Sequence, residues 1–165
     1  MNRNSIDIFN YSIKSEIVAA ASSQTHVWII LRDHQFHVIN SKNPRDVYSF
    51  VITTPSKNSI SNNYNIYVSP DEKSCVLIIQ EYLYHYSLLT PDEPPKIFQI
   101  PPNECPKCGT WYTEDNSLYF VFCTTRGKVY QYSLETRFTN DLYTTEKGRP
   151  IYNIKIIQST STSKD

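Results

Sequence analysis

Two cysteines with the spacing of metal ligands form the clearest chemical motif in this chain. Cys105-Pro106-Lys107-Cys108-Gly109 has the C-P-x-C-G form of one zinc-ribbon knuckle, whose tight turn lets two thiolates hold one ion. A structural zinc site needs four ligands, and the sequence has no second C-x-x-C pair. Cys75, Cys123 or His85 would have to complete the site, yet all three fall within expected strands. We therefore predict no metal site and no cofactor. Cys105 and Cys108 are the candidate ligands, expected as a reduced pair in a loop.

Four histidines form a second candidate cluster. His26, His34 and His37 lie close together in the sequence, and His85 follows His37 at the repeat distance described below. A histidine trio can bind a metal or titrate near neutral pH. His34 and His37 differ by three positions, so a strand would point them to opposite faces. We therefore expect ordinary exposed or half-buried histidines with no catalytic or metal-binding role.

No residue pattern indicates an enzyme. Enzymes built from repeated sheets often place carboxylates or metals on the first strand of each repeat, and short strands are expected here at Ile17–Ala19, Asn65–Tyr67 and Thr110–Tyr112. None of the three carries an acidic cluster. The three glycines of the chain are too few for a phosphate-binding loop. We predict a protein without catalytic or cofactor-binding residues.

Composition narrows the class of partner. The chain has 165 residues, with 16 Lys and Arg against 16 Asp and Glu, so it carries no basic field that would attract nucleic acid. Its longest apolar runs, such as Val27–Leu31, are far shorter than the ~20 residues of a membrane span. Four cysteines do not suggest a disulfide framework, which favours a cytoplasmic location without direct membrane insertion.

Three stretches of the sequence resemble one another. Phe36-His37-Val38-Ile39, Tyr84-His85-Tyr86-Ser87 and Tyr130-Gln131-Tyr132-Ser133 begin 48 and then 46 positions apart. A repeat of about 40–50 residues built from short strands is typical of β-propeller blades. Nearly continuous apolar runs precede each repeat, as expected for strands covered on both faces.

The predicted fold is an all-β partial propeller of about three four-stranded blades. The blades are expected at 16–53, 63–100 and 109–145, with 151–157 as the first strand of a fourth, so that 1–158 forms one domain before a disordered tail at 159–165. A closed ring needs about 4–8 blades. Closure would require a longer chain, recruitment of a strand near Ile6–Phe9, or self-association through open sheet edges.

The order of these elements resembles the N-terminal propeller of the vacuolar protein sorting protein 18 family, also called Pep3/deep orange. The resemblance covers roughly 15–157 and rests on four segments: Ile17–Asn40, Ser69–Ile78, Cys123–Gln131 and Leu142–Ile151. It implies a subunit of a class C tethering complex (HOPS or CORVET), peripheral on late endosome, vacuole or lysosome membranes. The implied partners are the other class C subunits.

The functional expectation is a non-catalytic protein–protein interaction scaffold in endosome-to-vacuole traffic. Two alternatives remain open at this point. One is a WD-repeat-like adaptor propeller outside trafficking, and the other is a small zinc-binding module built on Cys105 and Cys108.

Overall fold

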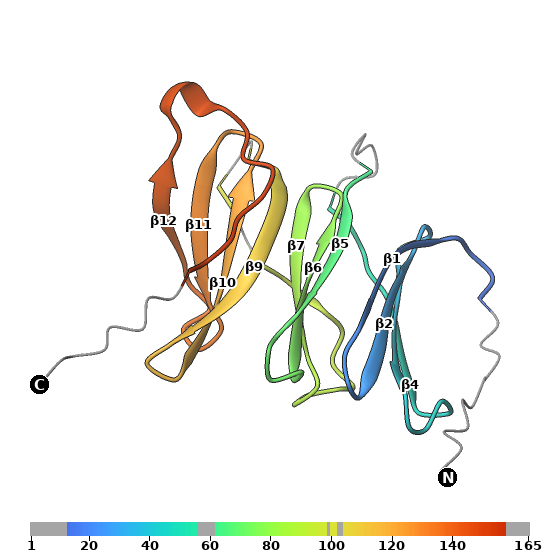
Figure 1. Ribbon diagram of the computed structural model, residues 1–165. Coiled ribbons are helices and arrows are strands. Elements are labelled where there is room, and N and C mark those ends of the chain that lie inside the picture. Colours follow the sequence, from blue (N-terminus) through green and yellow to red (C-terminus); the bar gives the residue numbers. More distant parts are fainter. Residues whose placement is uncertain (1–12, 56–61, 99, 102–103, 158–165) are drawn as a thin grey trace, which may run out of the picture.

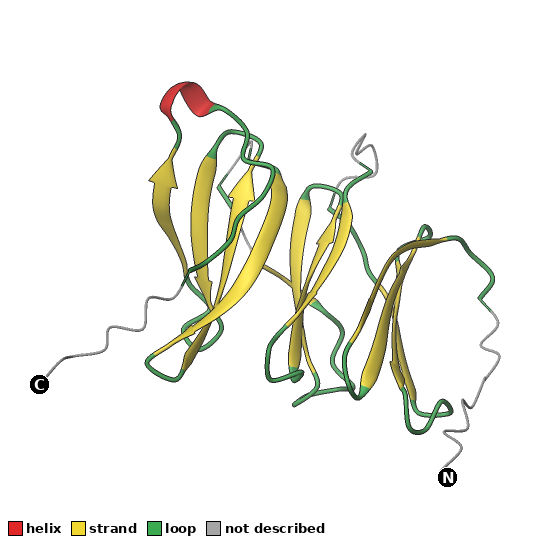
Figure 2. Cartoon of the chain, viewed as in Figure 1, coloured by secondary structure: helices red, strands yellow, loops and turns green. Residues whose placement is uncertain are grey.

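The computed structural model describes residues 13–55, 62–98, 100–101 and 104–157. These residues form three four-stranded antiparallel sheets and one three-residue 3-10 turn, η1 (Glu146–Gly148) (Figure 2). The prediction of an all-β chain with three four-stranded blades is confirmed. The strand expected near Ile6–Phe9 and the tail at 159–165 lie outside the described residues.

Each sheet is a meander in which every strand pairs with the next strand along the chain. Blade 1 consists of β1 (Ile17–Ser22), β2 (His26–Leu31), β3 (Gln35–Asn40) and β4 (Val47–Val51). Blade 2 consists of β5 (Tyr64–Val68), β6 (Ser74–Ile79), β7 (Tyr82–Ser87) and β8 (Lys96–Phe98). Blade 3 consists of β9 (Pro106–Glu114), β10 (Ser117–Thr124), β11 (Lys128–Ser133) and β12 (Thr139–Thr144).

The three blades stand side by side in an open row (Figure 1). Their first strands lie next to one another, because β5 contacts both β1 and β9. Blades 1 and 3 lie at opposite ends of the row, so the described blades do not close into a ring (Figure 1).

The second strand of each blade is deeply buried. All six residues of β6 are buried, as are the last four of β2 and the last five of β10. β6 carries an unbroken apolar run because blade 1 covers one of its faces and blade 3 covers the other. The expectation of strands covered on both faces is therefore confirmed for blade 2.

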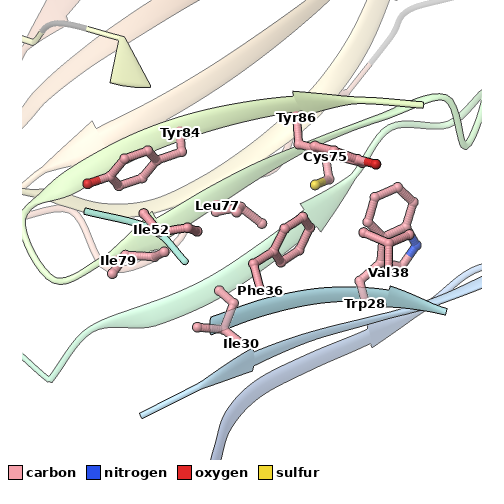
Figure 3. Close-up of a cluster of buried hydrophobic side chains, with 10 residues drawn as sticks. All are labelled: Trp28, Ile30, Phe36, Val38, Ile52, Cys75, Leu77, Ile79, Tyr84 and Tyr86. Carbon is pink, nitrogen blue, oxygen red and sulfur yellow. The ribbon is translucent and has the colours of Figure 1, made fainter. Parts of the chain in front are cut away.

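Blades 1 and 2 pack through one apolar cluster (Figure 3). Trp28 and Phe36 from blade 1 meet Tyr86 from blade 2, with ring centroids 6.1 and 5.3 Å from that of Tyr86. Both contacts are edge-on, which is a favoured geometry for aromatic pairs. Leu77 and Cys75 fill the same layer and are fully buried. This layer fixes blade 1 against blade 2.

Blades 2 and 3 pack through a second cluster that uses the opposite face of β6. Val76 and Ile78 meet Phe120 and Phe122 from blade 3, all with no exposed surface. The Trp111 indole N–H donates a hydrogen bond of 2.8 Å to the Tyr67 carbonyl, which ties β9 to β5. Alternate residues of β6 therefore serve alternate interfaces, as the period of two in a strand requires.

The three sequence repeats all fall on the third strand of a blade, but they do not face the same way. Tyr84 and Tyr130 point toward the preceding blade, whereas Phe36 points toward the following one. The first repeat is therefore one residue out of phase with the other two. A shift of one residue reverses the face of every side chain in a strand, so a match of residue types does not ensure a match of orientation.

Two expected boundaries change in the structure. β9 begins at Pro106 instead of near residue 109, because Cys108 and Gly109 pair with Cys123 and Phe122 of β10 and so extend the strand. The stretch 151–157 forms no strand in the structure, since none of the described residues pairs with it. Its place as the first strand of a fourth blade remains a prediction.

Gly127 occupies the turn between β10 and β11. Its φ of +73° lies in the left-handed region, and a Cβ there would come within 1.9 Å of the Thr145 hydroxyl. Both the backbone conformation and the close approach of the 145–149 segment therefore require glycine.

Candidate functional site

The structure separates the two cysteines that the sequence analysis singled out. Cys105 precedes β9, and its carbonyl accepts a hydrogen bond of 2.9 Å from the Thr125 amide. Cys108 lies within β9, directly opposite Cys123 in β10. The expectation that both cysteines share a loop is therefore wrong for Cys108, because β9 starts earlier than predicted.

Of the three residues expected to complete a zinc site, Cys123 lies opposite Cys108, but the other two lie elsewhere. Cys75 lies in the core between blades 1 and 2, whereas His85 lies between blades 2 and 3, 6.2 Å from the Tyr132 ring. In the described part of the chain, no three His, Cys, Asp or Glu side chains gather closely enough to hold a metal ion. Burial raises the pKa of the Cys105 and Cys108 thiols, which disfavours the thiolate that a metal requires. The zinc module therefore finds no support in this geometry.

The histidines of blade 1 each have their own surroundings. The His26 ring nitrogen Nδ1 lies 2.8 Å from the Thr25 hydroxyl, and His37 Nδ1 lies 2.8 Å from the Ser49 hydroxyl. His34 occupies the β2–β3 turn with φ of +63°, and its Nε2 lies 3.3 Å from the Tyr64 hydroxyl. Each of these three side chains contacts a different residue in a different turn or strand. The structure therefore brings no pair of them together around a common ligand.

A groove lies between the outer strands of blades 2 and 3. It has a volume of about 730 Å³. Strands β7 and β8 form one wall, and β11 with the start of β12 forms the other. Its central side chains are His85, Phe98, Tyr130, Tyr132, Arg137 and Phe138. A volume of this size lies within the range of small-molecule and peptide sites, roughly 300–1,000 Å³.

The floor of the groove is aromatic and rigid. The rings of Phe98 and Tyr132 stack with their centroids 4.2 Å apart and their planes 15° apart. Tyr132 is only 3% exposed, so its ring is held from both sides. This stack joins β8 of blade 2 to β11 of blade 3 and keeps the two walls of the groove in place.

The rim of the groove carries charge. Lys96 forms an ion pair with Glu93, and Arg137 stands across from them on the β11–β12 turn. Arg137 and Lys96 both act on His85, whose pKa falls to about 4, chiefly through burial and then through these two cations. His85 is therefore neutral at pH 7, and the groove has a local excess of positive charge.

Sequence reasoning did not find this groove. It named His85 only as a metal ligand and Tyr130 and Tyr132 only as aromatics. One signal was present: the proline-rich loop Pro91–Pro95 leads into an outer strand of only three residues, β8. Such a short outer strand leaves the facing side of blade 3 uncovered, and this is where the groove lies.

Comparison with solved structures shows which fold this arrangement represents. The structure of U3-55K matches with a TM-score of 0.58 and 8% identity over 83% of this chain, and the RRP9 WD40 repeats match with 0.57 and 8% over 81%. The β-propeller domain of Myceliophteria thermophila Cps50 (Swd1) matches with a TM-score of 0.56 and 11% identity over 81% of this chain. The chain is a partial β-propeller.

The match covers only part of each propeller. This chain spans 42% of the U3-55K chain, 43% of the Cps50 chain and 40% of the RRP9 chain. No protein-family model matches the sequence, and no curated protein matches it. The likeness therefore establishes the fold. Within the described residues, no helix has the length and apolar character needed to cross a bilayer.

Proposed function

We propose that this chain is a non-catalytic protein–protein interaction scaffold. The observation that carries the proposal is the groove between blades 2 and 3, with an aromatic floor and a charged rim. Aromatic residues and arginine are enriched where proteins bind one another. The WD40 propeller fold adds support, because such propellers present surfaces to other proteins.

We further propose that the scaffold belongs to a class C tethering complex, HOPS or CORVET, and acts at late endosome, vacuole or lysosome membranes. Support comes from the order of sequence elements over 15–157, which resembles the propeller of the vacuolar protein sorting protein 18 family. A WD-repeat-like adaptor outside trafficking is the second candidate, and the similarity to the WD40 structures above favours it.

Co-purification of the affinity-tagged chain from cells tests both candidates. Recovery of the other class C subunits in stoichiometric amounts is expected under the tethering proposal. Stoichiometric recovery of a different protein set would reject tethering and support the adaptor. Absence of any stoichiometric partner would reject the scaffold itself. The variant Leu77→Ala, which damages the core between blades 1 and 2, serves as the control for loss of fold.

We also propose that the chain self-associates through the end of the row formed by blade 3. Exposed large apolar side chains occur on β12 and in the segment that follows it, including Leu142, Tyr143, Tyr152 and Ile157, which are 51%, 58%, 73% and 84% exposed. Unpaired sheet surfaces of this kind favour pairing with another chain. Sedimentation velocity over a range of concentrations should show a dimer that weakens in Tyr143→Ser with Tyr152→Ser. A strict monomer with a sharp, reversible melt would contradict this proposal.

A further inference from the structure

The groove offers accessible apolar surface above its rigid floor. Phe138 is 63% exposed and Ile97 is 46% exposed, and both line the groove from opposite blades. Two apolar side chains facing one concave site can enclose a third, supplied by a ligand. The ligand should therefore carry an aromatic or large aliphatic side chain.

Arg137 supplies a cation without a fixed partner. Among the described residues, Lys96 is paired with Glu93, whereas no carboxylate lies within ion-pair distance of Arg137. Its guanidinium can bind a carboxylate through two parallel hydrogen bonds. The ligand should therefore also carry a carboxylate.

Arg137 occupies a tight turn with an unusual backbone conformation. Its φ is +57°, a left-handed conformation that suits glycine or asparagine better than arginine. The turn is closed by hydrogen bonds from the Arg137 amide to the Ser133 carbonyl (2.9 Å) and from the Ser133 amide to the Phe138 carbonyl (3.0 Å). Six other non-glycine residues in the described part of the chain also have a positive φ, so the turn explains how Arg137 is held at the groove and is not by itself evidence of function.

His85 lies on the groove wall, but its Nε2 atom is buried and has no hydrogen-bond partner among the described residues. Because this atom has no accessible surface, the side chains that can contact a ligand are those of Arg137, Phe138 and Ile97.

We propose that this groove binds an extended peptide of a partner protein in which an acidic residue lies beside an aromatic one. The carboxylate pairs with Arg137, and the aromatic side chain packs between Phe138 and Ile97. This inference rests on the scaffold function proposed above and names the partner chemistry of the same site.

Nucleic acid fits the groove less well. Its cations are Arg137 and Lys96, and Lys96 is already neutralised by Glu93. Binding to a phosphate backbone draws its affinity from several cations in a row. The equal numbers of acidic and basic residues in the chain supply no wider positive field.

Fluorescence anisotropy on the full chain tests the proposal. The probe is a fluorescein-labelled synthetic peptide with two Asp-Phe pairs in a Gly-Ser spacer, compared with analogues carrying Asn-Phe or Asp-Ala pairs. The variants are Arg137→Gln and Phe138→Ala, both at exposed positions. The controls are Arg45→Gln and Val51→Ala, which are exposed and do not line the groove.

Arg137→Gln should weaken binding of the Asp-Phe peptide by about tenfold, and the controls should bind within about twofold of the native chain. The Asn-Phe peptide should bind the native chain and Arg137→Gln equally weakly, because neither complex contains the ion pair between a peptide carboxylate and Arg137. Equal binding of Asp-Phe and Asn-Phe peptides by the native chain would overturn the proposal. Tighter binding of an oligouridine probe, lost in Arg137→Gln, would replace it with a nucleic-acid site.

The same variant separates this inference from the scaffold function. If the chain co-purifies with its partners equally well as the native protein and as Arg137→Gln, the scaffold proposal stands and the groove proposal fails. If neither form recovers a partner while the peptide binds, the groove proposal stands and the scaffold proposal fails.

Discussion

The carboxylate of Glu72 reaches from blade 2 to the backbone and hydroxyl of Thr25 in blade 1. The Thr25 hydroxyl donates a 2.9 Å hydrogen bond to Glu72 Oε2, and the Gln24 amide donates one of 2.9 Å to Oε1. Glu72 occupies the β5–β6 turn with φ of +57°, so the turn itself directs the side chain toward the neighbouring blade. The contact joins two blades through their turns, in addition to the apolar layer between them.

Glu72→Ala should lower the melting temperature and make it less sensitive to acid. The hydrogen bond from the Gln24 amide is the main reason that the pKa of Glu72 is lowered. A carboxyl whose folded-state pKa lies below its unfolded value stabilises the fold above the unfolded pKa, and this contribution disappears as the pH falls through the folded pKa. Thermal melts between pH 7 and 3 measure the effect. Glu114→Ala, at an exposed position, is the control, and identical pH profiles for native and Glu72→Ala chains would contradict the prediction.

Leu77→Ala should destabilise the chain by about 2–5 kcal/mol, the usual cost of removing a large aliphatic side chain from a core. Leu77 is fully buried in the layer between blades 1 and 2 (Figure 3). Leu89→Ala removes the same atoms from a side chain that is 73% exposed, and it should cost no more than about 0.5 kcal/mol. Urea unfolding compares the two variants. Equal losses would mean that the blades are not packed as described.

The four cysteines should react with iodoacetamide in two classes. Cys75 and Cys123 have no exposed surface, whereas Cys105 and Cys108 are half-buried. Burial raises the pKa of all four thiols, that of Cys123 to about 12, so the reaction should be slow throughout. Mass spectrometry should find Cys105 and Cys108 modified first, with the other two modified only after denaturation. Early modification of Cys75 would contradict the blade 1–blade 2 interface.

His85 should make the fold sensitive to acid over a defined range. Its pKa is about 4, below the ordinary value of 6.5, because burial and the nearby Arg137 and Lys96 disfavour the charged ring. The neutral ring therefore stabilises the fold above about pH 6.5, and this contribution, at most about 3 kcal/mol, is lost as the pH falls toward 4. Glu93, which also lines the groove, remains paired with Lys96 over most of this range because the ion pair lowers its pKa.

Urea unfolding at pH 7, 6, 5 and 4 checks this prediction. The variant His85→Phe keeps an aromatic ring against Tyr132 but cannot bind a proton, so its stability should fall less steeply between pH 6.5 and 4. His26→Phe is the comparison at a second histidine with a lowered pKa. Parallel curves for the native chain and His85→Phe would show that His85 carries no acid sensitivity.

Much of the fold follows from local patterns in the sequence. Runs such as Cys75–Ile79 predict strands buried on both faces, because a continuous apolar strand is stable only between two covering layers. The turn at Arg126-Gly127 was also predictable, since glycine adopts a positive φ at little cost. Other left-handed positions could not be predicted in this way. His34, Gln80 and Lys147 have a positive φ, but their residue types do not favour that conformation, so the sequence does not indicate it.

Local strand and turn patterns predict three four-stranded sheets, their strand order and the place of the repeats on the third strands, because such patterns act over a few residues. The face that each side chain takes, and the residues it contacts there, depend instead on how the blades pack. Cys108 lies in a strand and not in the expected loop, because β9 pairs with β10 as far as Pro106. Phe36 packs against the following blade, whereas Tyr84 and Tyr130 pack against the preceding one. The groove at Arg137 and His85 arises from segments about fifty residues apart, brought together by the packing of one blade on the next. Such contacts depend on register and inter-blade packing, which local residue patterns do not encode.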